Sequence, residues 1–249
     1  MHEVPAGGDY DAYVREYAAA VGQREEGGVS GDPFGILPAL LELLGDIGGQ
    51  RVLDAGCGTG YLARVLAARG ARVTGVDVSP RLVAAARQRD PAGAIEYRAA
   101  DLSQPWPEAA GSFDAVASYL VLNDVPDYQG FAATLAAVLA PGGRLVLALN
   151  NPYGAVVHAH VDDYFDSGAV SVYRGFLPLG IRVYHYHRTL ADYLDAFLGT
   201  GLRLARLADL TGLAGERRPQ TRLPDGARFP RFMLLSFTKP HARAGDTAG

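Results

Sequence analysis

The chain has 249 residues, of which 49% are hydrophobic and 20% are charged, and its net charge at pH 7 is −4. A chain of this size can bury one complete core, so we expect a single domain spanning residues 1–249. The acidic balance and the lack of a basic run exclude a protein that follows a phosphate backbone. We therefore expect a small-molecule substrate and no nucleic-acid partner. The single cysteine excludes an internal disulfide bond.

The sequence has no signal-peptide pattern and no apolar run of membrane-spanning length. These absences predict a cytoplasmic protein without a membrane partner. The sequence predicts no metal site and carries no signal for an oligomeric state.

The first predicted element is a helix near the N-terminus. Tyr10, Tyr13 and Tyr17 lie at helical spacing, and the pair Gly27-Gly28 follows them. This spacing is typical of an amphipathic helix whose aromatic stripe packs on the edge of a larger body. The glycine pair would suit a hinge.

The most informative segment is a glycine-rich loop between a strand at 51–55 and a helix at 60–69. Its glycines alternate along the chain, at Gly56, Gly58 and Gly60. Such a loop lets the backbone turn sharply and approach a ligand closely, at the start of a helix whose free N–H groups point at it. Tyr61 is too large for the third small position of a dinucleotide loop, and the Gly-Lys-Ser/Thr of a P-loop is absent. The pattern indicates a nucleotide-type cofactor.

Further strands alternate with helices along the first 150 residues. We predict strands near 72–77, 95–100, 113–118 and 144–149, and helices near 80–89 and 128–139. Asp77 ends the second strand, where a carboxylate can accept both hydroxyls of a ribose. Ser79 and Pro80 then predict the N-cap and first position of a helix. This alternation argues for a doubly wound, mostly parallel α/β sheet with helices on both faces.

After the fifth strand the alternation breaks, and residues 150–188 form an insertion. The pair Asn151-Pro152 stops regular structure, and alternating residues at 181–188 predict a strand. Regular structure resumes with a helix from the N-cap Thr189 to about Leu198, followed by strands at 202–209 and 232–238. The tail 241–249 lacks apolar anchors, and we expect it to be disordered.

Five segments of the chain resemble, in order, the motifs of the class I S-adenosylmethionine-dependent methyltransferases. They are the D-x-G-x-G-x-G loop from Asp54, the acid Asp77, the pair Asp101-Leu102, and residues 112–118 and 139–147. The resemblance implies a Rossmann-like, seven-stranded sheet with an antiparallel last strand, an inserted cap after strand five, and S-adenosylmethionine as cofactor with S-adenosylhomocysteine as product. It implies that Asp77 binds the ribose and that Asp101 and Leu102 bind the adenine amino group. The other expected cofactor contacts are Asp54, Gly56, Cys57, Gly58, Gly60, Val78, Ser79, Ser118, Tyr119 and Asn123.

The resemblance gives the N-terminal segment 1–30 a second interpretation. In related small-molecule methyltransferases a segment before the glycine loop folds over the cofactor. Tyr13 and Tyr17 would then be lid contacts rather than packing residues. Both interpretations stand at this point.

The insertion is the predicted substrate cap, because loops after strand five border the ligand crevice of such sheets. His187 and His185 are the candidate bases, with His187 first. The alternative for each is a histidine that only forms a structural hydrogen bond. The box His187–Leu190 resembles a mostly bacterial, small-molecule branch of the family, although that branch usually has His-Pro where this chain has Asn151-Pro152. The predicted acceptor contacts are Asn150, Asn151, Tyr153, Tyr164 and Tyr184.

The predicted function is methyl transfer from S-adenosylmethionine to an oxygen or nitrogen of a small molecule, as a step in secondary metabolism. Positioning the acceptor and excluding water would supply most of the catalysis, because the cofactor carries the activated methyl group. The alternative is a protein of the same fold that binds the cofactor without methyl transfer, either a cyclase- or isomerase-like enzyme or a ligand-binding regulator.

Overall fold

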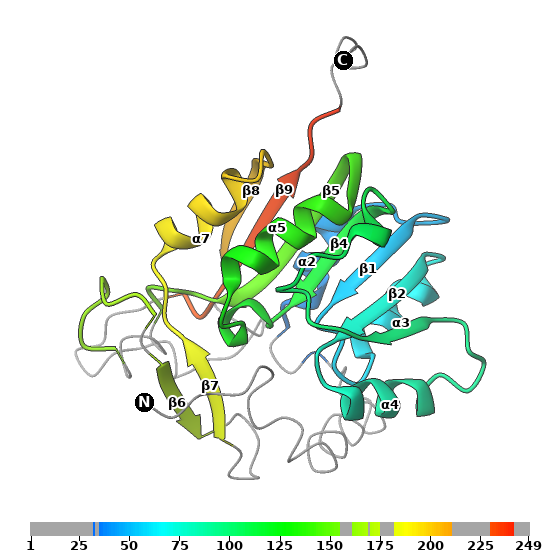
Figure 1. Ribbon diagram of the computed structural model, residues 1–249, viewed down its shortest axis with the longest axis horizontal. Helices are drawn as coiled ribbons and strands as arrows, with labels where there is room; N and C mark the ends of the chain where they lie inside the picture. The colour runs from blue at the N-terminus through cyan, green and yellow to red at the C-terminus, as the bar shows by residue number, and fades with distance from the viewer. Residues whose placement is uncertain are drawn as a thin grey trace.

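The computed structural model describes residues 32, 35–154, 161–168, 170–174, 182–210 and 230–241. Its centre is a seven-stranded sheet in the order β3-β2-β1-β4-β5-β9-β8 (Figure 1). The strand β9 is antiparallel to both of its neighbours, and the other pairs in the sheet are parallel. The predicted sheet is therefore confirmed. Its strands are β1 (Arg51–Ala55), β2 (Arg72–Asp77), β3 (Glu96–Ala99), β4 (Phe113–Tyr119), β5 (Leu139–Asn150), β8 (Arg203–Leu210) and β9 (Phe232–Thr238).

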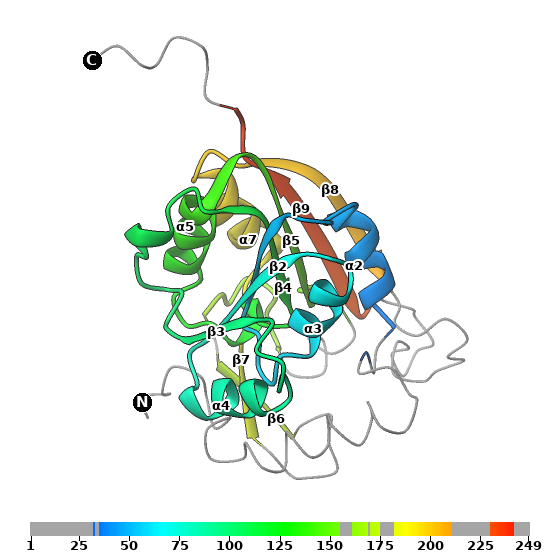
Figure 2. The same cartoon turned by 90° about the vertical axis from the view of Figure 1, so that its right-hand side faces the viewer.

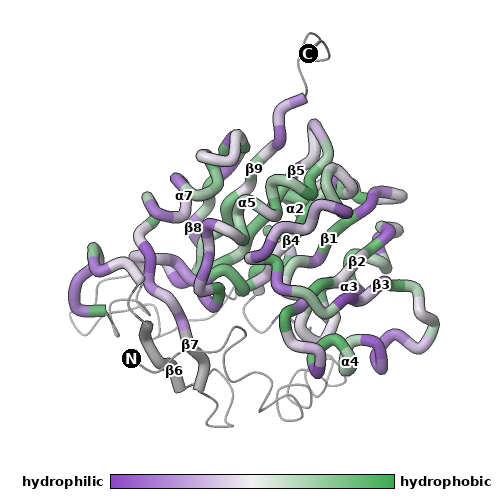
Figure 3. Tube along the Cα trace, in the orientation of Figure 1, coloured by the Kyte–Doolittle hydropathy of each residue, from purple (hydrophilic) through white to green (hydrophobic). Residues whose placement is uncertain are grey.

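Helices cover both faces of the sheet, as Figure 2 shows from the side. Successive strand residues point to opposite faces, so Leu53 packs in one core with α5 and α7, whereas Val52 packs in the other with α2, α3 and α4. Figure 3 shows the hydrophobic residues gathered along the central strands. The helices are α2 (Leu37–Leu44), α3 (Tyr61–Ala68), α4 (Pro80–Gln88), α5 (Tyr128–Val138) and α7 (Leu190–Leu198), with short 3-10 turns η2 (Pro107–Ala109) and η3 (Leu122–Asp124).

The predicted helix starts follow from their capping residues. The Ser79 hydroxyl accepts a hydrogen bond from the backbone N–H of Leu82 at 3.1 Å, and Pro80 opens α4. Thr189 and Asp192 form a capping box at the start of α7, in which each side chain accepts from the other's backbone N–H. These caps fix where the two helices begin relative to the strands before them.

Three elements differ from the prediction. Strand β5 begins at Leu139, five residues before the predicted start at 144. Leu139 pairs with Phe113, and a register shift follows at the Pro-Gly-Gly segment before the regular pairing with β4 continues. Helix α2 was not predicted. The insertion contains a strand β6 (Val170–Arg174) that pairs with the predicted one, β7 (Arg182–Tyr186), in a separate antiparallel sheet. This two-stranded sheet lies below the main sheet in Figure 1.

The end of β9 is joined to the end of α5 by Lys239, the only lysine in the chain. Its ammonium group donates to the carbonyl oxygens of Ala136 and Leu139, each at 2.8 Å. A cation at this place is favourable because the last carbonyls of a helix lack partners and carry partial negative charge. The tail predicted to be disordered lies, from residue 242 on, outside the described residues.

Candidate active site

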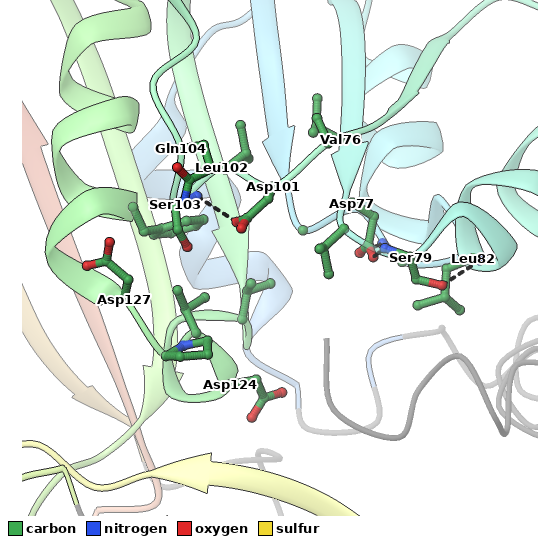
Figure 4. Close-up of a pocket in the computed structure, with 18 of the residues that line it drawn as sticks. Val76, Asp77, Ser79, Leu82, Asp101, Leu102, Ser103, Gln104, Asp124 and Asp127 are labelled. Atoms are coloured by element: carbon green, nitrogen blue, oxygen red, sulfur yellow. Dashed lines mark hydrogen bonds between the residues drawn. The ribbon is translucent and has the colours of Figure 1, made fainter. Parts of the chain in front are cut away.

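A cavity of about 350 Å³ opens at the carboxyl ends of β1, β2 and β4 (Figure 4). Its size is within the range of small-molecule sites, and its position is where ligands bind in open α/β sheets. The lining comes from the glycine loop, the end of β2, the segment after β3, and the segment from the end of β4 into α5. The lining residues are Gly56, Gly58, Val76–Ser79, Leu82, Ala100–Gln104, Tyr119–Val121, Asp124–Asp127 and Phe131.

The glycine loop needs its glycines for two reasons. The φ angles of Gly56, Gly58 and Gly60 are 82°, 53° and 78°, in the left-handed region that side chains disfavour. A Cβ on Gly56 would lie 2.3 Å from a methyl carbon of Val121, and one on Gly60 would lie 2.4 Å from the hydroxyl of Tyr97. Gly56 and Gly58 line the cavity, whereas Gly60 caps α3. The loop thus presents bare backbone to the ligand.

Two carboxylates mark the side of the cavity formed by β2 and β3. Asp77 accepts hydrogen bonds from the backbone N–H groups of Gly58 and Ser79, both at 2.9 Å. Asp101 accepts from the N–H of Ser103 at 2.9 Å, as the dashed line in Figure 4 shows. These bonds hold the carboxylates in place beside Val78 and Leu102, which also line the cavity. A ligand with hydroxyl and amino donors matches this side.

Four predicted cofactor contacts lie behind the cavity lining. Asp54 is almost fully buried, and burial, with a smaller contribution from the nearby Asp77 charge, raises its pKa to about 7. Burial also raises the pKa of the Cys57 thiol, which makes this side chain a filler rather than a nucleophile. Ser118 donates to the carbonyl oxygen of Ala55 at 2.9 Å. Asn123 accepts from the N–H of Asn150 at 2.9 Å. All four support the loops instead of facing the cavity.

Tyr119 lines the cavity and connects it to the N-terminal part of the described chain. Its hydroxyl donates to the buried carboxylate of Asp32 at 2.6 Å, and that carboxylate also accepts from the N–H of Leu37 at 2.8 Å. The predicted lid contacts Tyr13 and Tyr17 lie outside the described residues.

The opposite side of the cavity begins at Asp124, which the sequence analysis did not single out. Nδ1 of His185, on β7, lies 2.8 Å from Oδ1 of Asp124. Figure 4 shows Asp124 across the opening from Asp77 and Asp101, near β7. Asp77 and Asp101, which follow the second and third strands, were both predicted as site residues. Asp124 lies five residues after β4, and this position in the same series was the signal that could have identified it.

Arg188 stabilises this side of the cavity, and the sequence analysis did not predict it as a site residue. Its buried guanidinium donates to the carbonyl oxygens of Val125 and Pro126 at 2.7 Å each, and to that of Leu122 at 3.4 Å. It lies over the ring of Tyr128 at 4.3 Å. Arginine suits this role because its planar fork serves several acceptors at once. The His-Arg-Thr box therefore fixes the loop that lines the cavity.

The described side chains predicted to bind the acceptor do not line the cavity. The hydroxyl of Tyr153 and the amide nitrogen of Asn151 both donate to the carboxylate of Asp209, and Asn150 is buried in β5. The Tyr164 hydroxyl accepts from the N–H of Leu190 at 2.9 Å. Tyr184 lies on β7, opposite Val172, and its side chain is outside the described part.

His187 is part of the same framework. Its Nε2 lies 2.8 Å from the carbonyl oxygen of Tyr164, so this nitrogen carries the proton and donates it. Its ring is buried and meets the ring of Tyr164 edge-on. In the described structure His187 joins the insertion to the start of α7, and His185 is the histidine next to the cavity.

Among the described residues, no helix is long and apolar enough to cross a membrane. No group of three or more His, Cys, Asp or Glu is placed to hold a metal ion in that part of the chain.

S-adenosylmethionine fits the residues that are present. Its methionine part requires a close approach to backbone, and Gly56 and Gly58 line the cavity without side chains. Its ribose hydroxyls and adenine amino group are donors, and the side of the cavity at Asp77 and Asp101 presents acceptors.

Comparisons with known proteins agree with this geometry. Residues 53–147 match the family model described as a methyltransferase domain. The chain is 33% identical over 223 residues to a ubiquinone biosynthesis O-methyltransferase from Xanthomonas oryzae pv. oryzae, covering 85% of this chain and 88% of that protein. It is 43% identical over 110 residues to a demethylmenaquinone methyltransferase from Tropheryma whipplei, a match that spans 44% of this chain and only 45% of that protein.

Among solved structures, an S-adenosylmethionine-dependent methyltransferase from Mesorhizobium loti is similar with a TM-score of 0.63 and 26% identity. The similarity covers 82% of this chain and 97% of that one. The cofactor is therefore S-adenosylmethionine, and the chain belongs to the family of S-adenosylmethionine-dependent methyltransferases.

Proposed function

We propose that this methyltransferase acts on a hydroxyl or amino group of a small molecule. The observation that carries the proposal is the two-sided cavity. One side presents the glycine loop, Asp77 and Asp101, and the other, which we call the acceptor end, consists of Asp124, Val125 and Pro126. One relative is named for demethylmenaquinone and the other for ubiquinone biosynthesis, which supports a small acceptor. Secondary metabolism remains a second proposed setting.

Three residues would hold the cofactor. Asp77 would accept the ribose hydroxyls, because the backbone N–H groups of Gly58 and Ser79 hold its carboxylate at the cavity lining. Asp101 would accept from the adenine amino group. Gly58 would let the methionine part lie against the backbone. The bound cofactor supplies a methyl group already activated on a sulfonium.

The acceptor end would orient the nucleophile. Asp124 reaches the cavity, and its carboxylate can accept a hydrogen bond from a hydroxyl or amine. His185 would position this carboxylate through the 2.8 Å contact at Nδ1. We assign His187 a structural role, because its Nε2 already donates to the Tyr164 carbonyl. The proposed catalytic group is thus Asp124 with His185.

The test has two stages. Calorimetry first measures binding of S-adenosylmethionine and S-adenosylhomocysteine. The protein with S-adenosylmethionine is then incubated with a panel of phenols, amines and quinone precursors, and S-adenosylhomocysteine is quantified by mass spectrometry. Acceptor-dependent product supports the proposal. Tight cofactor binding with no product from any acceptor would favour the alternative of a cofactor-binding protein without methyl transfer.

A further inference from the structure

The chain leaves β4 through a strained backbone conformation at Leu120. The φ angle of this residue is 59°, in the left-handed region, and every other residue with a positive φ in the described part of the chain is a glycine. The region is disfavoured for residues with a Cβ, and leucine lacks the short polar side chain that lets asparagine enter it. Leu120 also lines the cavity. Strain of this kind persists at functional sites where the surrounding structure imposes it.

Bonds on both sides of Leu120 impose the turn. Its own N–H donates to the carbonyl oxygen of Ala148 on β5 at 2.8 Å. Before it, the Tyr119 hydroxyl donates to the Asp32 carboxylate at 2.6 Å. After it, the Val121 carbonyl oxygen accepts from an N–H of η3 at 2.8 Å. The backbone is therefore held at Leu120, immediately before it and immediately after it.

The turn decides which core the following side chains face. In an extended strand, successive side chains point to opposite faces of the sheet. Here Tyr119 and Leu120 both pack on the core that contains α2, α3 and α4, and Val121 packs on the core that contains α5 and α7. An extended backbone at Leu120 would place its side chain and that of Val121 on the opposite faces. The left-handed turn thus brings Val121 to its position.

In that position Val121 packs against the glycine loop. A Cβ on Gly56 would lie 2.3 and 2.6 Å from the two methyl carbons of Val121, so the valine fills the place that a side chain at Gly56 would need. On its other side the loop is bonded to β2, because the N–H groups of Gly56 and Cys57 donate to the carbonyl oxygen of Val76 at 2.8 and 2.9 Å. The glycine loop is held between the end of β2 and Val121.

We propose that Leu120 is a positioning residue for cofactor binding. Its left-handed turn sets Val121 against Gly56, and this contact keeps the glycine loop in the shape that receives S-adenosylmethionine. The half-buried side chain of Leu120 locks the turn by packing on the core, where a glycine would leave the backbone free. The inference concerns the cofactor side of the cavity and does not depend on the identity of the acceptor.

Two substitutions separate the turn from the apolar side chain. Leu120→Ile keeps the volume and the apolar character but adds a branch at Cβ, where a positive φ leaves the least room. Leu120→Asn loses the apolar character and keeps a residue that enters the left-handed region. In calorimetry, Leu120→Ile should bind S-adenosylhomocysteine about tenfold more weakly than wild type, the loss expected if only about a tenth of the protein retains the turn. Leu120→Asn should bind more tightly than Leu120→Ile.

A packing role alone gives the opposite order, because isoleucine replaces the apolar contacts of leucine and asparagine does not. Thermal unfolding without ligand is measured in parallel, so that affinities are compared at a temperature at which every variant is folded. The control is Leu207→Ile, at a half-buried position in β8 where a β-branched residue suits the strand, and it should bind like wild type. Binding by Leu120→Ile that equals or exceeds that of Leu120→Asn would overturn the inference.

A second set of variants tests the contact between Val121 and Gly56. Gly56→Ala should weaken S-adenosylhomocysteine binding, and adding Val121→Ala should restore part of the affinity, because it removes both methyl carbons that the new Cβ would meet. In the matched control, Gly60→Ala, the new Cβ would meet the hydroxyl of Tyr97 instead, so adding Val121→Ala should restore nothing. Restoration in both pairs, or in neither, would overturn the role of Val121. If the wild-type protein does not bind S-adenosylhomocysteine, the cofactor assignment fails and the inference fails with it.

Discussion

Arg188 offers the most direct test of how the cavity is built. We consider Arg188→Met, which keeps about the length of the aliphatic stem and removes the guanidinium. The variant loses two hydrogen bonds of 2.7 Å to the carbonyls of Val125 and Pro126. It also leaves those carbonyls without their donor in a part-buried position, and it removes the contact over the Tyr128 ring.

The magnitude follows from these bonds. A hydrogen bond to a charged group contributes about 1.5–3 kcal/mol, so two bonds give about 3–6 kcal/mol. The removed charge no longer has to be desolvated, which offsets part of this loss. We expect the free energy of unfolding to fall by about 3 kcal/mol. For a chain of this size, this corresponds to a decrease in Tm of about 6–12 °C.

The assay is thermal unfolding followed by circular dichroism, together with calorimetry of S-adenosylhomocysteine binding. Affinity should also fall, because the two carbonyls belong to residues that line the cavity. Arg188→Lys should be intermediate, since an ammonium lacks the planar fork. Arg69→Met, at an exposed position, is the matched control. If Arg188→Met is no less stable than Arg69→Met and binds equally well, Arg188 does not hold the loop.

Three further predictions concern the cofactor side. Asp77→Ala should weaken S-adenosylhomocysteine binding by about 1.5–3 kcal/mol in calorimetry, because a charged acceptor for the ribose is lost; unchanged affinity would remove the ribose assignment. Gly58→Val, at a φ of 53°, should abolish binding because the side chain would enter the cavity, and normal binding by this variant would contradict the close approach of the loop. The raised pKa of Asp54, about 7, means that the folded state binds this proton more tightly than the unfolded state. Wild-type stability should therefore fall relative to Asp54→Asn as pH rises from about 4 to about 7, by at most about 4 kcal/mol, since each tenfold difference in proton affinity corresponds to about 1.4 kcal/mol. Denaturant unfolding at several pH values measures it, and parallel pH profiles for the two proteins would show that Asp54 does not titrate in this range.

The sequence predicted the strands, the glycine loop and the helix starts around the cavity because their signals are local. The turn at Gly56 to Gly60 depends on φ angles that glycine alone favours, and the start of α4 depends on Ser79 and Pro80. Helix α2 also has a local pattern, because its buried residues Leu37, Leu40, Leu41 and Leu44 lie at helical spacing. This pattern was sufficient to predict the helix, although the sequence analysis did not include it.

The acceptor end of the cavity and the residues that support it depend on contacts between parts of the chain that are distant in sequence. Asn151 meets Asp209, 58 residues away, and the Arg188 guanidinium meets carbonyls 62 to 66 residues away. Backbone carbonyls exist at every residue, so no sequence pattern marks those that accept from Arg188. His185 and His187 share one strand face in the sequence pattern, and only the fold shows that the first meets Asp124 and the second the Tyr164 carbonyl.

Lys239 gives the molecule a single side chain for amine-directed labelling. An amine must be unprotonated and accessible to attack an acylating reagent, but the Lys239 nitrogen donates to the Ala136 and Leu139 carbonyls in the folded protein. The reagent can react only when the Lys239 nitrogen leaves these carbonyls at the end of α5. Since no other side chain carries a primary amine, the rate of modification at this residue, followed by mass spectrometry, reports how often that junction opens. The protein thus contains its own probe of this contact between Lys239 and the end of α5.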